Sequence, residues 1–210
     1  MYESTIESTD AVGSNTIAIT VSTPDGFEAE PGQFVLFEAE IDGAEETGYY
    51  TISSPEVTDS FEITVAVDPD GTLGPWLADR PVGATLQFDG PYGEVEYTGG
   101  GDVAVLAAGP GIGPAVGIGE RALATDHDVV IGYEGEDPPH EERIRAIGDG
   151  GGEIVIEDEI GTVISRTDSL TDGRTIYVFG FSEFVEAARD GLKTAGIPSD
   201  VVEIENFGPA

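Results

Sequence analysis

The chain of 210 residues contains no cysteine. Disulfides, thiolate zinc sites, cysteine-ligated iron–sulfur clusters and a cysteine nucleophile are therefore all excluded on this chain. Histidine is nearly as scarce, since His127 and His140 are the only two. They lie apart in the sequence, so we expect two ordinary surface histidines and no metal site.

Positive charge is also scarce. Lys and Arg total 8 against 42 Asp and Glu, which gives a formal net charge of −34. Nucleic acids and anionic membranes are bound through lysine and arginine, so neither is an expected partner. The composition resembles that of proteins from salt-accumulating cells, where molar salt reduces the screening length to about 3 Å. We expect the fold to need salt, because screening weakens its self-repulsion.

Long apolar segments are missing as well. No run of 18 apolar residues occurs, and the N-terminus lacks the basic-then-apolar pattern of a secretion signal, so we expect a soluble cytoplasmic protein. Hydrophobic residues still make up 39% of the chain, with 9 Phe and 7 Tyr. This apolar content is enough to offset the entropy of ordering the chain, and a folded protein is expected.

Residues 1–98 have the pattern of a small antiparallel β domain. Short β-rich runs alternate with Pro/Gly turns, which is typical of a barrel or a sandwich, and a six-stranded barrel is the expected fold. One short helix is expected at 73–79. The runs that stand out as strands are Thr16–Ser22, Gln33–Ile41, Tyr49–Ser53, Phe61–Val67 and Thr85–Phe88.

Residues 101–210 have a different pattern. Continuous apolar runs alternate with helical periodicity, which predicts βαβ units and a five-stranded parallel, doubly wound nucleotide-binding sheet. The expected strands are Val103–Ala107, Val129–Tyr133, Ile154–Glu157, Thr175–Phe179 and Val201–Glu205. The expected helices cover about 113–124, 138–147, 162–169 and 182–195.

Two local motifs could carry chemistry. The sequence AAGPGIGP at 107–114 joins an apolar strand to a helix through glycines, which let the backbone approach a phosphate at a helix N-terminus. The sequence YTISSP at 50–55 ends a strand with an aromatic face and hydroxyls that suit a planar ring. Taken alone, each motif is equally compatible with ordinary structure: a strand-to-helix turn and a β-strand.

Six motifs together resemble the ferredoxin–NAD(P)H reductase family, in the same order and over essentially the whole chain. They are YYTISSP (49–55), DGTLGPWL (70–77), GPYG (90–93), AAGPGIGP (107–114), YVFG (177–180) and ENFGP (205–209). The resemblance implies an FAD-binding barrel followed by an NAD(P)-binding sheet. It also implies hydride transfer between NAD(P)H and FAD, after which single electrons pass to a carrier such as ferredoxin.

The resemblance assigns roles to individual residues. Tyr50 would stack on the isoalloxazine ring, Thr51 would hydrogen-bond the ring nitrogen that accepts hydride, and Phe207 and Glu205 would approach the ring from the last strand. The other cofactor contacts that it implies are Ile52, Ser53, Val65, Ala66, Val67, Gly71, Thr72 and Leu73 for FAD, and Gly109, Pro110, Gly111, Ile112, Gly113 and Gly180 for the dinucleotide.

The chain departs from the family's pattern at several positions. Gly48 replaces a phosphate-binding arginine, Gly74 replaces a hydroxyl, and Phe179 and Phe181 replace a cysteine and a proline. These changes weaken phosphate anchoring and alter the nicotinamide side of the site. Two alternatives therefore stay open: an electron-transfer subunit of a larger dehydrogenase complex, and a non-catalytic nucleotide-binding module that has lost flavin.

Three acids follow the second strand of the predicted nucleotide-binding sheet: Glu134, Glu136 and Asp137. The additional phosphate of NADP needs a cation or a hydrogen-bond donor near this position. The acids therefore predict a preference for NADH. The competing interpretation is that they belong to the acidic surface found everywhere on the chain.

Overall fold

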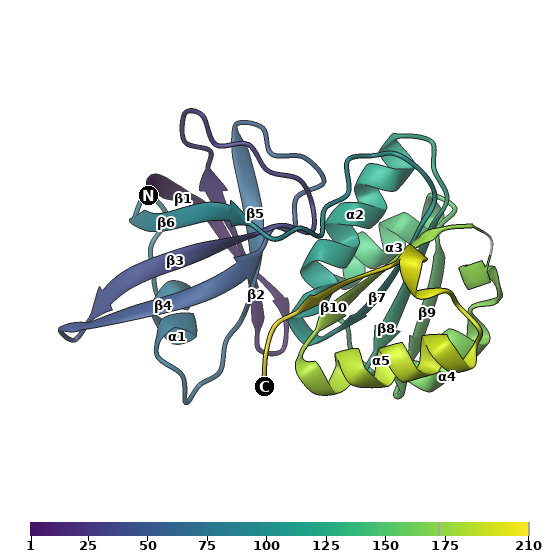
Figure 1. Cartoon of the computed structure of the whole chain (residues 1–210). Helices are drawn as coiled ribbons and strands as arrows, with labels where there is room; N and C mark the ends of the chain where they lie inside the picture. Colours follow the sequence, from purple (N-terminus) through teal and green to yellow (C-terminus); the bar gives the residue numbers. More distant parts are fainter. Residues whose placement is uncertain (172, 210) are drawn as a thin grey trace.

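The computed structural model describes residues 1–171 and 173–209, and Figure 1 shows a half made mostly of β-strands beside an α/β half. The β half is one six-stranded sheet in the order β4-β3-β6-β1-β2-β5 with antiparallel pairs. A bridge between Ile52 and Ile63 joins its two edges into a barrel. The strands are β1 (Tyr2–Gly13), β2 (Thr16–Ser22), β3 (Phe34–Ile41), β4 (Ala44–Thr51), β5 (Ser60–Ala66) and β6 (Thr85–Tyr92).

The α/β half is a parallel five-stranded sheet in the order β11-β10-β7-β8-β9. The predicted fold class is confirmed in both halves. The strands are β7 (Val103–Ala108), β8 (Val129–Glu134), β9 (Glu153–Glu157), β10 (Thr175–Gly180) and β11 (Val202–Asn206). The helices are α1 (Leu73–Ala78) in the barrel half, then α2 (Ile112–Ala124), α3 (Glu141–Asp149), α4 (Ile160–Arg166) and α5 (Ser182–Thr194). The 3₁₀ turns are η1 (Gly109–Gly111), η2 (Asp168–Thr171) and η3 (Ser199–Val201).

The first strand, β1, is an element that the sequence patterns did not indicate. Its twelve residues are mostly polar, and only Ser4 and Ile6 among them are buried. Pairing explains why it forms, because β2 covers one edge of β1 and β6 covers the other. Backbone hydrogen bonds to two neighbours hold this strand where side-chain hydrophobicity is too weak to reveal it.

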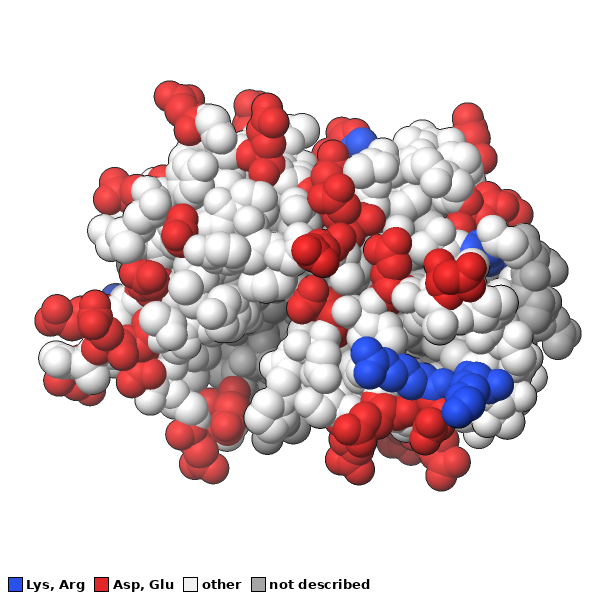
Figure 2. Space-filling view, in the orientation of Figure 1, with Lys and Arg blue, Asp and Glu red and all other residues white. Residues whose placement is uncertain are grey.

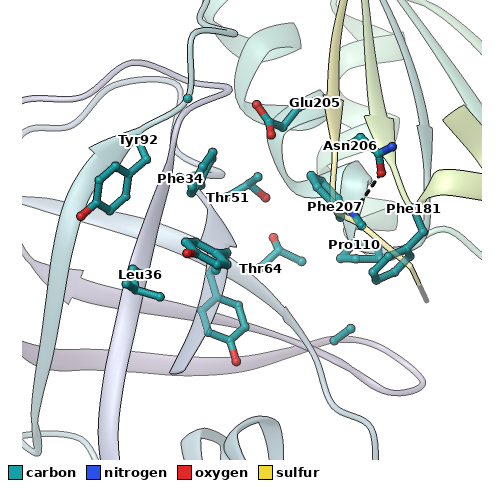
Figure 3. Close-up of a pocket in the computed structure, with 15 residues that line it drawn as sticks. Phe34, Leu36, Thr51, Thr64, Tyr92, Pro110, Phe181, Glu205, Asn206 and Phe207 are labelled. Carbon is teal, nitrogen blue, oxygen red and sulfur yellow. Dashed lines mark hydrogen bonds between the residues drawn. The ribbon is translucent and has the colours of Figure 1, made fainter. Parts of the chain in front are cut away.

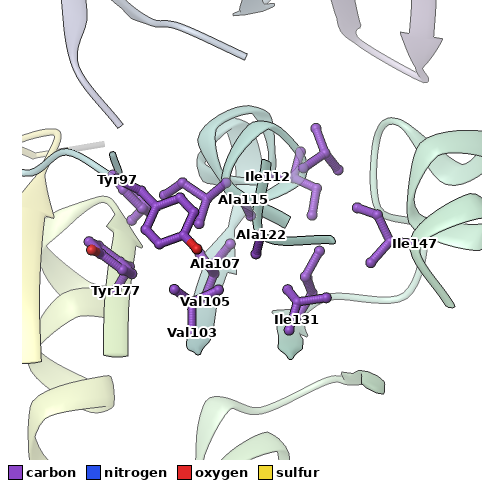
Figure 4. Close-up of a cluster of buried hydrophobic side chains, with 14 of the residues drawn as sticks. Tyr97, Val103, Val105, Ala107, Ile112, Ala115, Ala122, Ile131, Ile147 and Tyr177 are labelled. Carbon is purple, nitrogen blue, oxygen red and sulfur yellow. The ribbon is translucent and has the colours of Figure 1, made fainter. Parts of the chain in front are cut away.

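Three apolar clusters support this arrangement. One fills the barrel with phenylalanines, including Phe37, Phe61 and Phe88, which are each at most 1% exposed. The other two lie on opposite faces of the parallel sheet. Figure 4 shows the cluster under α2 and α3, where Val105, Ile112 and their neighbours pack. The cluster under α4 and α5 covers the other face. The central strands β7, β8 and β10 are therefore buried on both sides, as their continuous apolar runs predicted, whereas the edge strands β9 and β11 are partly exposed.

Acidic side chains dominate the molecular surface. Figure 2 shows them spread over both halves of the visible face, where basic side chains are few. Among the described residues, no helix is long and apolar enough to cross a membrane.

This charge gives a testable expectation about stability. With a net charge of −34, we expect the melting temperature to rise by about 10 °C or more between low and molar KCl, because ions screen the self-repulsion. Sorbitol at matched osmolality, which screens nothing, should raise it much less. Equal melting temperatures in low and molar KCl would contradict this expectation.

Candidate functional site

A cavity of about 860 Å³ lies where the barrel meets the α/β half (Figure 3). Its volume is in the range of natural sites for small molecules and cofactors. Both halves contribute to its walls. The lining residues from the barrel half are Phe34, Leu36, Tyr49, Tyr50, Thr51, Thr64, Ala66, Tyr92 and Gly93. Those from the α/β half are Pro110, Phe181, Glu205, Asn206, Phe207 and Gly208.

Tyr50 is held on the barrel wall by close packing. Its ring centroid is 5.9 Å from that of Phe37, and burial raises the pKa of its hydroxyl to about 12. A Cβ atom at Gly48 would stand only 2.9 Å from the Tyr50 hydroxyl and 2.8 Å from Leu73. Glycine at position 48 therefore has a structural reason, because the Tyr50 ring and Leu73 occupy the space above it.

Gly74, the second glycine that departs from the family's pattern, also has a structural reason. A Cβ atom at Gly74, at the start of α1, would lie 3.2 Å from the carbonyl oxygen of Ala66 and 3.4 Å from Cα of Val67. Close approach of α1 to the end of β5 therefore favours glycine here. Ala66 is exposed and lines the cavity, so α1 packs directly behind part of the cavity wall.

The α/β wall is built at the carboxyl ends of three parallel strands, which is where open α/β sheets bind their ligands. Pro110 follows β7, Phe181 follows β10 and Phe207 follows β11. The rings of Phe181 and Phe207 meet edge to face at 5.9 Å and 87°. Figure 3 shows these three residues close together on one side of the cavity.

Polar contacts fix the segment that carries Phe207. Oδ1 of Asn206 accepts hydrogen bonds from Oγ of Ser182 at 3.1 Å and from the Gly208 N–H at 2.9 Å. The Phe207 N–H donates to the carbonyl oxygen of Gly180 at 2.9 Å. The end of β11 is therefore fixed to the start of α5. This attachment holds the rings of Phe181 and Phe207 next to each other.

One acid lies in this largely apolar cavity. Glu205 lines it from β11, and burial raises the pKa of its carboxyl. Among the described lining residues there is no lysine or arginine. The cavity therefore suits a planar, largely uncharged group better than a phosphate.

The substitution at Phe179 does not alter the cavity. Its side chain is fully buried under α2, where it stacks on Tyr177 at 6.4 Å. The sequence-based expectation that this ring changes the nicotinamide side of the site is wrong, because β10 directs Phe179 into the core. Of these two phenylalanines, Phe181 is the one that lines the cavity.

The glycine-rich turn has two distinct parts. Gly109 has a φ of +53° with open space around it, and Pro110 lines the cavity. Gly111, Ile112 and Gly113 are instead buried. A Cβ atom at Gly111 would overlap the backbone of Phe179, and one at Gly113 would stand 2.5 Å from Oγ1 of Thr64. Only the first part of the turn is available to a ligand, while the second part packs the two halves together.

The structure places the other predicted contacts around the cavity without bringing them all to its wall. Tyr50, Thr51, Ala66, Pro110, Glu205 and Phe207 line it. Val67 is half-buried, Gly71 and Thr72 are exposed, and none of the three is among the lining residues. Those that are buried and contribute backbone or packing are Ile52, Ser53, Val65, Leu73 and Gly180.

His140 was expected at the surface, and that expectation is wrong. Its side chain is 4% exposed and its Nε2 lies 2.8 Å from Oγ1 of Thr64. Burial, with a smaller effect of nearby Arg143, lowers the pKa of His140 to about 3, so the imidazole is neutral at neutral pH. His127 is half-buried, and its Nε2 accepts a hydrogen bond from the Gly101 N–H at 3.1 Å.

Comparison with known proteins identifies the family. Residues 3–97 match the family model of the oxidoreductase FAD-binding domain. Over 200 residues, the chain is 32% identical to the ferredoxin reductase component of 3-ketosteroid-9-alpha-monooxygenase from Mycobacterium tuberculosis. That match covers 84% of this chain and 54% of the relative. Residues 3–97 therefore belong to the oxidoreductase FAD-binding domain family, and the chain as a whole is similar to ferredoxin reductase flavoproteins.

Two further similarities concern the sequence of the barrel half and the fold of the whole chain. The reductase subunit of glycine betaine monooxygenase from Chromohalobacter salexigens is 39% identical over 123 residues, covering 56% of this chain and 33% of that subunit. The solved FAD/NAD-binding domain of nitric oxide dioxygenase from Vibrio cholerae has the same fold, with a TM-score of 0.81 at 18% identity. That structural match covers 99% of this chain and 98% of the other. This chain therefore spans about half the length of the Mycobacterium tuberculosis relative and a third of that of the Chromohalobacter salexigens subunit.

The cavity of this flavoprotein fits the ring system of FAD. Tyr50 supplies an aromatic face, Thr51 supplies a hydroxyl that can donate or accept, and much of the remaining barrel wall is apolar. The pyrophosphate has less support, because Gly48 provides no cation and Arg80, the barrel's one basic residue, lies over the ring of Trp76 at 4.4 Å. Binding of FAD therefore depends mainly on the ring and on backbone donors.

Proposed function

We propose that this flavoprotein oxidises NAD(P)H through FAD and passes electrons singly to a protein carrier such as a ferredoxin. In this proposal residues 1–98 are the FAD-binding domain and residues 101–210 the NAD(P)-binding domain. The observation that carries it is the cavity, where Tyr50 and Thr51 from a barrel of the FAD-binding family face Pro110, Phe181 and Phe207 from a parallel sheet. Neither alternative, an electron-transfer subunit or a module without flavin, is favoured by these observations.

Each wall has its own task in the proposed reaction. FAD, when bound, supplies the hydride-accepting ring and the conversion of a two-electron donor into single electrons. Tyr50 binds the ring by its face, and the Thr51 hydroxyl orients the ring edge. Phe181 and Phe207 cover the opposite side and exclude water, while Pro110 and Gly109 receive the dinucleotide at the end of β7. Alignment of the two reactants is the main contribution of such a site, because proximity and orientation lower the barrier.

The carrier is proposed from chemistry and from the relatives. The chain has no cysteine, so it holds no cysteine-ligated iron–sulfur cluster of its own. The Mycobacterium tuberculosis relative is called a ferredoxin reductase component. With 42 acids on this chain, an acidic carrier would have to dock through apolar contacts and screened charges rather than by electrostatic attraction.

We also propose a preference for NADH. Glu136 and Asp137 are exposed after β8, and Oε2 of Glu134 accepts a hydrogen bond from the Ile160 N–H at 2.8 Å. We expect kcat/KM for NADH to exceed that for NADPH by about tenfold or more, because the additional phosphate meets like charges. Steady-state kinetics at constant KCl measure the ratio.

A double variant tests whether these acids cause the preference. E136Q/D137N should reduce the NADH preference, while Glu134 is left intact because its carboxylate caps α4. A wild-type protein that prefers NADPH, or a double variant with an unchanged ratio, would contradict this assignment.

The cofactor part of the proposal has a direct test. The protein is purified in molar KCl, mixed with FAD and freed of excess FAD at constant salt, and its visible spectrum is recorded. We expect a retained flavin band, and with NADH we expect steady reduction of a one-electron acceptor such as cytochrome c. A protein that is folded by circular dichroism but retains no flavin would contradict the proposed function.

A further inference from the structure

Three side chains from distant parts of the sequence form a buried polar chain between the two halves. Nε2 of His140 lies 2.8 Å from Oγ1 of Thr64 on β5, and the same Oγ1 lies 2.6 Å from Oγ of Ser53, just after β4. Their exposed fractions are 4%, 2% and 0% respectively. Because a buried polar group without a partner costs free energy, each of the three depends on the others.

The backbone around His140 is attached to the barrel as well. The His140 N–H donates to the carbonyl oxygen of Val12 at 2.9 Å, and Pro139 packs against Gly13. His140 itself has a φ of 61°, in the left-handed region, and begins α3. That conformation is uncommon for a residue with a side chain. It is stabilised here by contacts on both the backbone and the imidazole.

Arg143 on α3, three residues after His140, makes a second contact with the barrel. The guanidinium of Arg143 donates to Glu62 on β5 at 2.6 Å and to the carbonyl oxygen of Ser53 at 2.7 Å. It also donates twice to the carboxylate of Glu120 on α2, each time at 2.8 Å. The start of α3 is therefore fixed to β5, which carries Thr64, and to Ser53 just after β4.

The middle residue of this polar chain lies at the cavity. Thr64 is one of the residues that line it, and Figure 3 shows Thr64 drawn among the lining side chains. Ser53 comes two residues after Thr51, which lines the cavity too. Gly113 of α2 packs directly on the hydroxyls of Thr64 and Ser53, since a Cβ there would be 2.5 and 2.8 Å from them. Any shift of this contact would move one cavity wall against the other.

We propose that His140 is a positioning residue, which acts through Thr64 to hold the barrel wall of the cavity in alignment with the α/β wall. The inference rests on the proposed function. The rate of hydride transfer depends steeply on the distance and angle between donor and acceptor. Binding of the dinucleotide depends mainly on residues of the α/β half. Loss of the contact should therefore reduce kcat and leave KM for NADH nearly unchanged.

Matched variants separate the hydrogen bond from the packing. H140Q keeps a polar nitrogen or oxygen at similar reach, whereas H140L fills similar space without one. T64V removes the hydroxyl and keeps the shape. H127L is the control, because His127 contacts the Gly101 N–H and is not among the cavity's lining residues.

The kinetic result follows from geometry. With the FAD-loaded protein at saturating NADH, we expect flavin reduction to slow by about tenfold in H140L and T64V, with KM for NADH within about twofold of the wild type. H140Q should remain within about threefold of the wild-type rate, and H127L should match it. An increased KM with an unchanged rate in H140L, or no rescue in H140Q, would overturn the proposal.

A second measurement does not use enzyme activity. Urea unfolding of the proteins without FAD, at constant KCl, gives a double-mutant cycle for H140L and T64V. We expect the effect of the two substitutions on the unfolding constant to be non-additive by about fivefold or more. If the effects of the two substitutions are additive, while the wild type binds FAD and is reduced by NADH, the positioning role alone is overturned. A wild type that NADH does not reduce would instead refute the proposed function.

Discussion

The variant G111A is expected to unfold at much lower urea concentration than the wild type. Gly111 has a helical φ of −59°, so alanine would not strain the backbone, but its Cβ would overlap the carbonyl group of Phe179. A backbone carbonyl in a parallel strand cannot move aside as a side chain can. We expect the free energy of unfolding to fall by about 3 kcal/mol, the upper part of the usual range for overpacking.

The control for this prediction is another glycine in a helix. Gly161 on α4 is exposed and has no atom within 4 Å of a Cβ position. G161A should therefore raise the free energy of unfolding by about 0.5 to 1 kcal/mol through helix propensity. Urea is the suitable denaturant because it leaves the ionic strength unchanged. Equal urea midpoints for G111A and the wild type would show that η1 does not pack on β10 as described.

The second large effect is expected at Tyr50. Y50A removes the aromatic face from the barrel wall, and we expect the Kd for FAD to rise by roughly thirtyfold, or about 2 kcal/mol. Y50F should bind FAD nearly as the wild type does, because the ring rather than the hydroxyl makes the contact. Fluorescence titration of FAD at constant KCl measures both values.

A stability measurement must accompany that titration. Tyr50 also packs on Phe37 and above Gly48, so Y50A is expected to lose some stability. Circular dichroism of each variant separates loss of folding from loss of FAD binding. A folded Y50A protein with wild-type affinity for FAD would exclude Tyr50 as the ring-stacking residue.

The sequence predicts the fold of this flavoprotein well because its apolar patterns differ so clearly between the halves. Continuous runs such as Val103–Ala107 are buried on both faces, and this is what a parallel sheet requires. The strand β1 (Tyr2–Gly13) escaped notice because few of its side chains are buried and its partners lie elsewhere in the sequence. Its stability comes from pairing, which a local pattern does not reveal.

The candidate site was predictable where it depends on motifs. Tyr50, Thr51, Pro110, Glu205 and Phe207 all reach one cavity, although they come from three separate segments. Which aromatic residue at the end of β10 would face the cavity was not predictable. Phe179 and Phe181 are both aromatic, and only the direction of each side chain at the strand end decides between them.

Contacts between the two halves were the least predictable part. Gly113 belongs to a motif that suggests phosphate binding, yet it lies against Thr64, which is distant in the sequence. His140 has no local feature that distinguishes it from a surface histidine, and its burial depends on Thr64 and Val12. Interfaces of this kind require knowledge of the tertiary arrangement, which periodicity and composition do not contain.

We propose that the cavity brings NADH and FAD into contact for direct hydride transfer. Anaerobic stopped-flow reduction of the FAD-loaded protein in molar KCl tests this contact, with NADH and with NADH deuterated at the transferred position. We expect rapid bleaching of the flavin band, which is slower with deuterated NADH because the transferred hydrogen moves in that step. A folded, FAD-loaded protein whose flavin band does not bleach with NADH would contradict it.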